Sequence, residues 1–100
     1  MNFQYQDRTL LISGVVELNA TNAGAFRDAA REAFKPETTI VTVDLAAARF
    51  VDSSGLGALV TIHKAMLARG GKLQILNPSP MARQVLELTQ LHRVFVIIPS

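Results

Sequence analysis

The sequence predicts an α/β domain in which a largely parallel sheet is connected by helices. Short β-branched segments alternate along the chain with longer segments of helical periodicity, and strands that alternate with helices need crossover connections, which make neighbouring strands parallel. The chain has 100 residues, of which 49% are hydrophobic. That is enough for one compact core and too little for two. We therefore predict a single domain over residues 1–100.

The first predicted strand region is Thr9–Glu17. Between its polar ends it is apolar, with Ser13 and Gly14 in its middle, and a glycine inside a strand pattern marks a break or a bend. We expect two short strands here, or one bent strand. The polar segment before it, residues 1–8, is free to add an antiparallel strand to the sheet.

A first helix is predicted over Thr21–Phe34. Apolar and small residues recur there with the i, i+3, i+4, i+7 spacing of an amphipathic helix. Thr21 or Asn22 can cap its N-terminus, and Lys35-Pro36 ends it. The compact, β-branched segment Ile40–Leu45 that follows has the composition of a buried strand.

Two further helices and two further strands are predicted in the second half of the chain. A helix over Ser54–Arg69 carries an apolar stripe and stops at two glycines, and a helix over Met81–Thr89 follows the turn-forming residues 77–80. The strands are Lys72–Leu76, between these helices, and Val94–Ile98. The predicted order is β, α, β, α, β, α, β.

Composition argues against several kinds of function. Ten Lys and Arg residues against eight Asp and Glu give a formal charge of +2. The two signs are interspersed, and no basic run with interleaved aromatic residues forms a surface for nucleic acid. The absence of cysteine excludes disulfides, thiolate metal sites and cysteine catalysis. No apolar run is long enough to span a bilayer. We expect a cytoplasmic protein that neither binds nucleic acid nor inserts into a membrane.

Catalysis and metal binding are not expected either. His63 and His92 are the only histidines, too few and too far apart in the sequence to indicate a metal site. A hydrolase triad on Ser54 lacks the Gly-x-Ser-x-Gly elbow. Gly55-Leu56-Gly57 is not a phosphate-binding loop, because no Lys-Ser/Thr pair follows it. We expect a non-enzymatic protein without a cofactor or a metal.

The segment Asp52-Ser53-Ser54-Gly55 joins a strand region to the predicted second helix. Asp52 and both serines are capping residues, and the positive end of a helix dipole favours an anion at this point. Gly55 and Gly57 have no side chains, so we expect the backbone around Ser54 to be open to close approach by another molecule. Local chemistry alone nevertheless favours an ordinary helix start over a modification site.

The sequence around this turn resembles the signature of the STAS family, named for sulfate transporters and anti-sigma-factor antagonists. The resemblance lies in Val43-Asp44-Leu45, in Phe50 to Leu59 and in Gly70-Gly71-Lys72-Leu73, and Thr21 to Phe26 is similar to the first helix region of the family. It covers nearly the whole chain, and the predicted order of elements is the STAS order. The resemblance implies a mixed, mostly parallel sheet with an N-terminal antiparallel strand and with helices packed mainly on one face.

The resemblance also implies a function. In stand-alone antagonists of the family, the second serine of the Asp-Ser-Ser-Gly turn is phosphorylated by an anti-sigma-factor kinase, which is a histidine-kinase-like ATPase. That position is Ser54 here, with Ser53 as the alternate. The unphosphorylated form is implied to bind the kinase and free a sigma factor or a comparable client. A serine phosphatase resets the phosphorylated form. A dianion inside an interface must be desolvated or repelled, so phosphate acts as an off switch.

A partner-binding surface follows from the same resemblance, and it comprises Asn19, Asp52, Ser53, Ser54, Gly55, Leu56 and Gly57. Many phosphorylated relatives carry a Leu-Asp pair before the first helix, where this chain has Leu18-Asn19. The nearby Glu17 can compensate for the missing charge. The neutral Asn19 leaves a second hypothesis open, in which the chain is a STAS subunit that binds the ATPase of a phospholipid-trafficking ABC transporter without a phosphorylation cycle.

Overall fold

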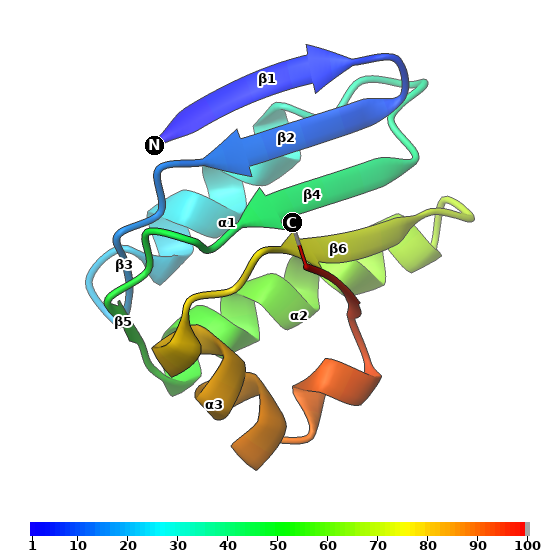
Figure 1. Cartoon of the computed structure of the whole chain (residues 1–100). Helices are drawn as coiled ribbons and strands as arrows, with labels where there is room; N and C mark the ends of the chain where they lie inside the picture. The colour runs from blue at the N-terminus through cyan, green and yellow to red at the C-terminus, as the bar shows by residue number, and fades with distance from the viewer. Residues whose placement is uncertain (100) are drawn as a thin grey trace.

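The computed structural model describes residues 1–99, in which a five-stranded mixed sheet is combined with three α-helices and a small second sheet (Figure 1). The strands are β1 (Asn2–Gln6), β2 (Thr9–Ser13), β3 (Glu17–Leu18), β4 (Ile40–Asp44), β5 (Phe50–Val51), β6 (Lys72–Leu76) and β7 (Val96–Ile98). The helices are α1 (Ala23–Glu32), α2 (Ser53–Leu67) and α3 (Pro80–Leu88), and a 3₁₀ helix spans Leu91–Arg93.

The main sheet has the strand order β1-β2-β4-β6-β7. Only β1 is antiparallel to its neighbour, and the other three pairings are parallel. The second sheet consists of β3 and β5, which are also parallel. The predicted fold class is confirmed, including the N-terminal antiparallel strand.

Helices α1 and α2 lie on one face of the main sheet, in line with the helices packed mainly on one face that the family resemblance implied, whereas α3 lies beside β5 (Figure 1). Successive side chains of a strand point to opposite faces. On the helical face, the three central strands contribute fully buried side chains, which are Leu10, Ile12, Val41, Val43, Leu73 and Ile75. On the other face, Gln4, Leu11, Thr42, Gln74 and Val96 form one row across all five strands. The hydrophobic core therefore lies between the sheet and the helices.

The break predicted at Gly14 is confirmed. β2 ends at Ser13, Gly14 has a φ of 72°, and β3 begins at Glu17. A positive φ is accessible to glycine without steric strain. The chain leaves the main sheet at this point and enters the small sheet, which lies beside the start of α2 (Figure 1).

The helix boundaries differ slightly from the predicted ones. α1 is shorter than Thr21–Phe34, because residues 19–22 form a separate turn in which Asn19 O accepts hydrogen bonds from the N–H groups of Asn22 and Ala23. α2 begins at Ser53 instead of Ser54, because Asp52 is the capping residue. α3 begins at Pro80, which suits a first helical position because that residue needs no N–H.

The last strand is shorter than the predicted Val94–Ile98. Leu91–Arg93 form a 3₁₀ helix that the sequence pattern did not indicate, and Val94 N–H donates to Leu91 O at 2.9 Å. Gln90 precedes this helix with a φ of 65°. Because Gln90 is neither glycine nor asparagine, the residue type gave no signal for a left-handed turn.

Candidate functional site

The Asp52-Ser53-Ser54-Gly55 turn lies where β5 passes into α2. In the small sheet, Glu17 pairs with Phe50 and Leu18 pairs with Val51. The ladder continues by one bond, in which Asp52 N–H donates to Leu18 O at 3.1 Å. This pairing brings the segment that follows β3, which includes Asn19, beside the first turn of α2.

Asp52 caps α2 and uses both of its carboxylate oxygens. Oδ1 accepts a hydrogen bond from Gly55 N–H at 3.0 Å, and Oδ2 accepts one from Ala20 N–H at 3.1 Å. The first bond satisfies an amide group that has no partner inside the helix. The second ties the loop before α1 to the start of α2. The half-buried Asp52 therefore holds the geometry of the turn.

Ser53 and Ser54 are the first two residues of α2, and both are exposed. The hydrogen bonds found within residues 1–99 include neither hydroxyl group. The first turn of α2 contains no acidic residue, so the carboxylate of Asp52, the capping residue before it, balances the positive end of the helix dipole. Both hydroxyls are thus free for chemistry, in a place where the backbone favours added negative charge.

Gly55 and Leu56 face the interior, which corrects the expectation that they line an open surface. A Cβ on Gly55 would lie 2.3 Å from Leu18 O, so glycine is required where α2 passes close to β3. Leu56 is 8% exposed and belongs to the core. Gly57 is exposed, and a Cβ there would meet no atom within 4 Å. The open backbone that was expected around Ser54 is therefore found at Gly57 alone.

Asn19 lies beside the turn, and its side chain is engaged within its own loop. Its Oδ1 accepts hydrogen bonds from Thr21 N–H at 3.0 Å and from Thr21 Oγ1 at 2.6 Å. Its backbone N–H donates to Asn22 Oδ1 at 2.8 Å. Both side-chain bonds use Asn19 as an acceptor, which a carboxylate could also be. The departure from the Leu-Asp pair thus changes the charge of this loop without requiring a different shape.

Exposed apolar side chains flank the turn, and sequence reasoning did not single them out. Phe50 in β5 is 51% exposed, and Val16, just before β3, is 44% exposed. Alternation along β5 places Val51 in the core and leaves Phe50 outside. In so short a strand the sequence cannot show which residue points inward. The short strand that leads into the turn therefore exposes an aromatic side chain.

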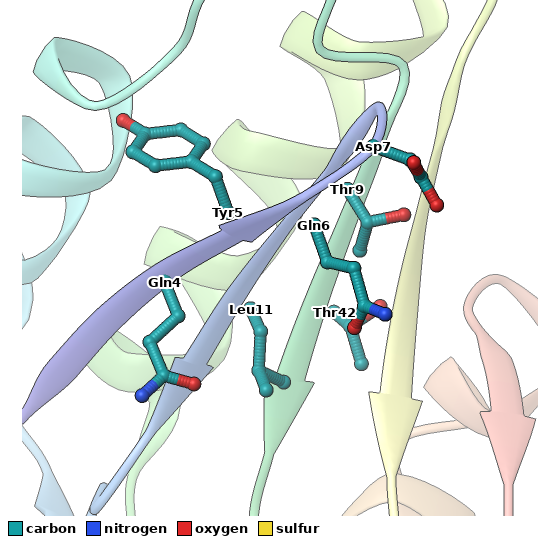
Figure 2. Close-up of a pocket in the computed structure, with 7 residues that line it drawn as sticks. All are labelled: Gln4, Tyr5, Gln6, Asp7, Thr9, Leu11 and Thr42. Atoms are coloured by element: carbon teal, nitrogen blue, oxygen red, sulfur yellow. The ribbon is translucent and has the colours of Figure 1, made fainter.

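The described chain offers few alternatives to this site. A cavity of about 330 Å³ lies on the helix-free face of the sheet, where Gln4, Leu11 and Thr42 contribute to its lining (Figure 2). Its lining includes no residue of the Asp52 turn. Over residues 1–99, no group of three or more His, Cys, Asp or Glu residues is placed to hold a metal ion. No helix of that stretch has the length and apolarity to cross a membrane.

Solved structures with a similar fold include stand-alone anti-sigma-factor antagonists. A Thermotoga maritima protein assigned as an anti-sigma factor antagonist is 26% identical with a TM-score of 0.91, over 99% of this chain and 86% of that one. The anti-sigma factor antagonist SpoIIAA in its unphosphorylated form is 24% identical with a TM-score of 0.82, and the match covers 99% of this chain and 88% of SpoIIAA. Phosphorylated SpoIIAA from Bacillus is 25% identical with a TM-score of 0.76, and the match covers 99% of this chain and 91% of that protein.

A comparison with curated proteins found no match. The sequence model of the STAS domain matches residues 1–100 of the chain. The resemblance seen in the sequence is thereby confirmed, and the chain belongs to the STAS domain family.

Proposed function

We propose that this STAS-family chain is an anti-sigma-factor antagonist that binds an anti-sigma-factor kinase while Ser54 is unmodified and is released when Ser54 is phosphorylated. The observation that carries this proposal is the free, exposed hydroxyl of Ser54 in the first turn of α2, within an Asp-Ser-Ser-Gly turn. SpoIIAA, a similar chain, is known in unphosphorylated and phosphorylated forms. That supports the compatibility of this fold with a phosphate.

Charge explains why phosphorylation would change binding more than folding. A phosphate on Ser54 adds about −1.5 to −2 units of charge at neutral pH. The amide groups at the start of α2 and the helix dipole stabilise that charge within the domain. A partner that covers the turn must desolvate the same charge next to the Asp52 carboxylate, and this opposes binding. The domain stays folded while the complex dissociates.

The partner surface of this proposal consists of the exposed members of the predicted set, extended by Phe50. Ser53, Ser54 and Gly57 present the polar and open part, and Phe50 provides an apolar side chain of the kind that anchors interfaces. Asp52 and Asn19 shape this surface through their hydrogen bonds to Ala20 and Thr21. Gly55 and Leu56 are buried beneath this surface and pack in the interior.

The direct test is phosphorylation by the cognate kinase with ATP, followed by mass spectrometry of the intact chain and its peptides. We expect one phosphate on Ser54, none on the Ser54→Ala variant, and unchanged modification of Ser53→Ala. A phosphate on Ser53 alone would move the site by one residue. No phosphate on any serine would contradict the proposal. A metal-dependent serine phosphatase is expected to restore the unmodified chain.

Capture of partners separates this function from the transporter hypothesis. The unmodified chain, used as bait in an extract of its own cells, is expected to retain a histidine-kinase-like ATPase. The Ser54→Glu variant serves as the matched bait, and we expect it to retain at least tenfold less of this ATPase. Recovery of a transporter ATPase by both baits would instead support the role of a transporter subunit, for which Ser54 is not a switch.

A further inference from the structure

β1 is an edge strand whose own residues carry none of the features by which proteins protect such edges. It lies at the end of the strand order, and four of its five residues are exposed. Natural edge strands are usually short, charged, bulged or interrupted by proline. The segment Asn2–Gln6 contains no charged residue and no proline, and it pairs with β2 in an unbroken register.

The opposite edge of the same sheet is protected. β7 has only three residues, Val96–Ile98, and Pro99 follows directly. Proline has no N–H to offer to another strand. The two edges therefore differ in their capacity to accept a further strand, and only the β1 edge is suited to it.

The backbone groups that face outward from β1 belong to Phe3 and Tyr5. Gln6 and Thr9 close a two-residue turn and are therefore a hydrogen-bonded pair. In an antiparallel ladder such pairs alternate with non-bonded pairs, so Asn2, Gln4 and Gln6 direct their N–H and C=O groups toward β2. The same groups of Phe3 and Tyr5 point away from the sheet.

A second β1 strand fits this edge in one symmetric register. If two copies run antiparallel about a two-fold axis through Gln4, then Phe3 of one faces Tyr5 of the other. These are the residues with outward backbone groups, so the two Phe3–Tyr5 pairs can exchange both of their bonds. Gln4 then faces Gln4 of the second copy at a non-bonded position, and Asn2 faces Gln6.

The side chains are also self-complementary in this register. Gln4 and Gln6 project on the helix-free face, whereas Tyr5 points the other way (Figure 2). Amides would therefore meet amides on one face, and an aromatic ring would meet an aromatic ring on the other. Tyr5 is already fixed, since its hydroxyl donates to Ala33 O and Lys35 Nζ lies 3.9 Å from its ring centroid. Little side-chain freedom would be lost on pairing.

We propose that the β1 edge is a self-association surface. Through it, two copies of this chain join their main sheets into one continuous ten-stranded sheet, in which the two central β1 strands are antiparallel. A single pair of five-residue strands buries less than the roughly 1,200 Å² of a standard stable interface. The dimer is therefore weak and reversible. The β1 edge belongs to the main sheet, whereas Ser54 lies in the first turn of α2, directly after β5 of the small sheet, so the dimer does not depend on phosphorylation or on the proposed function.

Charged substitutions of Gln4, the residue at the two-fold axis, test this dimer. In sedimentation velocity at concentrations from about 10 μM to about 1 mM, a range that spans weak affinities, the wild-type chain is expected to shift from monomer to dimer. Gln4→Lys and Gln4→Glu each place like charges opposite each other and are expected to weaken association at least tenfold. An equimolar mixture of the two variants is expected to restore it, because a lysine then faces a glutamate. Val96→Lys on β7 is the matched control and is expected to dimerise like the wild type.

Cysteine pairing tests the register, since the native chain has no cysteine. Gln4→Cys is expected to form a disulfide between two copies rapidly under mild oxidation, because non-bonded antiparallel pairs have the Cα separation that a disulfide requires. Gln6→Cys alone is expected to react at least tenfold more slowly, and to react rapidly when mixed with Asn2→Cys.

Three results would overturn the proposal. The first is a wild-type chain that stays monomeric at about 1 mM, which would leave the edge to an extended segment of another protein or to no partner. The second is association that Val96→Lys abolishes and the Gln4 variants do not. The third is equal crosslinking of Gln4→Cys and Gln6→Cys.

Discussion

The starts of α2 and α3 use the same capping device and leave opposite kinds of surface. Asp52 caps α2 through Gly55 N–H at 3.0 Å, and Ser79 caps α3 through Ala82 N–H at 3.1 Å. The hydroxyl of Ser79 also donates to Ala48 O at 2.8 Å, and the residue before it, Pro78, is buried. At α2 the capping is done by a carboxylate, and the two serines that follow it remain exposed.

This difference shows what makes a serine available for modification. Both helices begin with serine near a positive helix end, so helix dipole and residue type do not distinguish them. Ser79 is engaged in two hydrogen bonds as part of the fold. Ser54 does not take part in capping, because Asp52 caps α2. A serine next to an acidic cap is therefore a better candidate for a switch than a serine that is itself the cap.

The two sides of the first turn of α2 should respond very differently to a methyl group. Gly55→Ala is expected to lower the free energy of unfolding by about 3 kcal/mol or more, because its Cβ would lie 2.3 Å from Leu18 O. Gly57→Ala is the matched control, and it is expected to stabilise by up to about 1 kcal/mol. Urea denaturation followed by circular dichroism measures both. Equal effects would show that α2 does not pass as close to β3 as described.

The exposed aromatic residue before α2 should matter for binding and not for folding. Phe50→Ala is expected to weaken binding of the partner kinase by about 2 kcal/mol, as truncation of an interface anchor does. Its midpoint in urea should stay close to that of the wild type, because Phe50 is 51% exposed. Isothermal titration calorimetry with the unmodified chain gives the affinity. Leu67→Ala, at an exposed position near the other end of α2, is the control and is expected to leave binding unchanged.

The two caps should have similar energetic value despite their different chemistry. Asp52→Ala and Ser79→Ala each remove a cap together with a second hydrogen bond, and each is expected to destabilise the domain by about 1 to 2 kcal/mol. Asp52→Ala should additionally increase amide hydrogen exchange at Ala20, which Ser79→Ala should not. Unchanged exchange at Ala20 in Asp52→Ala would contradict the role of Asp52 in tying the two segments together.

A negative charge at Ser54 should have the smallest effect on stability. Ser54→Asp is expected to change the free energy of unfolding by less than about 1 kcal/mol, because attraction to the helix dipole is opposed by repulsion from Asp52. Thermal unfolding at low and high salt measures the balance, and Ser54→Asn provides a neutral control. A loss of several kcal/mol would mean that phosphate acts by unfolding the turn instead of blocking the partner.

The order of elements followed from the sequence because periodicity and chain breakers are local properties. The break at Gly14 and the strand Lys72–Leu76 were predicted at the positions where they occur, and the helices were predicted with errors of a few residues at their ends. The 3₁₀ helix at Leu91–Arg93 was missed, because it depends on a left-handed Gln90 that its residue type does not favour. The strand β1 was predicted only as a possibility, although apolar Phe3 and Tyr5 alternate with amides in Asn2–Gln6.

The sequence by itself determined the fold class, the family and the turn that carries Ser54, because these depend on residue types at fixed spacings. Only the tertiary structure decided how the residues of that turn divide between surface and interior. Gly55 and Leu56 look as available as Gly57 in the sequence, yet the approach of β3 buries the first two. Asp52 likewise gains its second partner, Ala20, from a segment 32 positions away. Such contacts depend on how distant strands pack, which no local pattern contains.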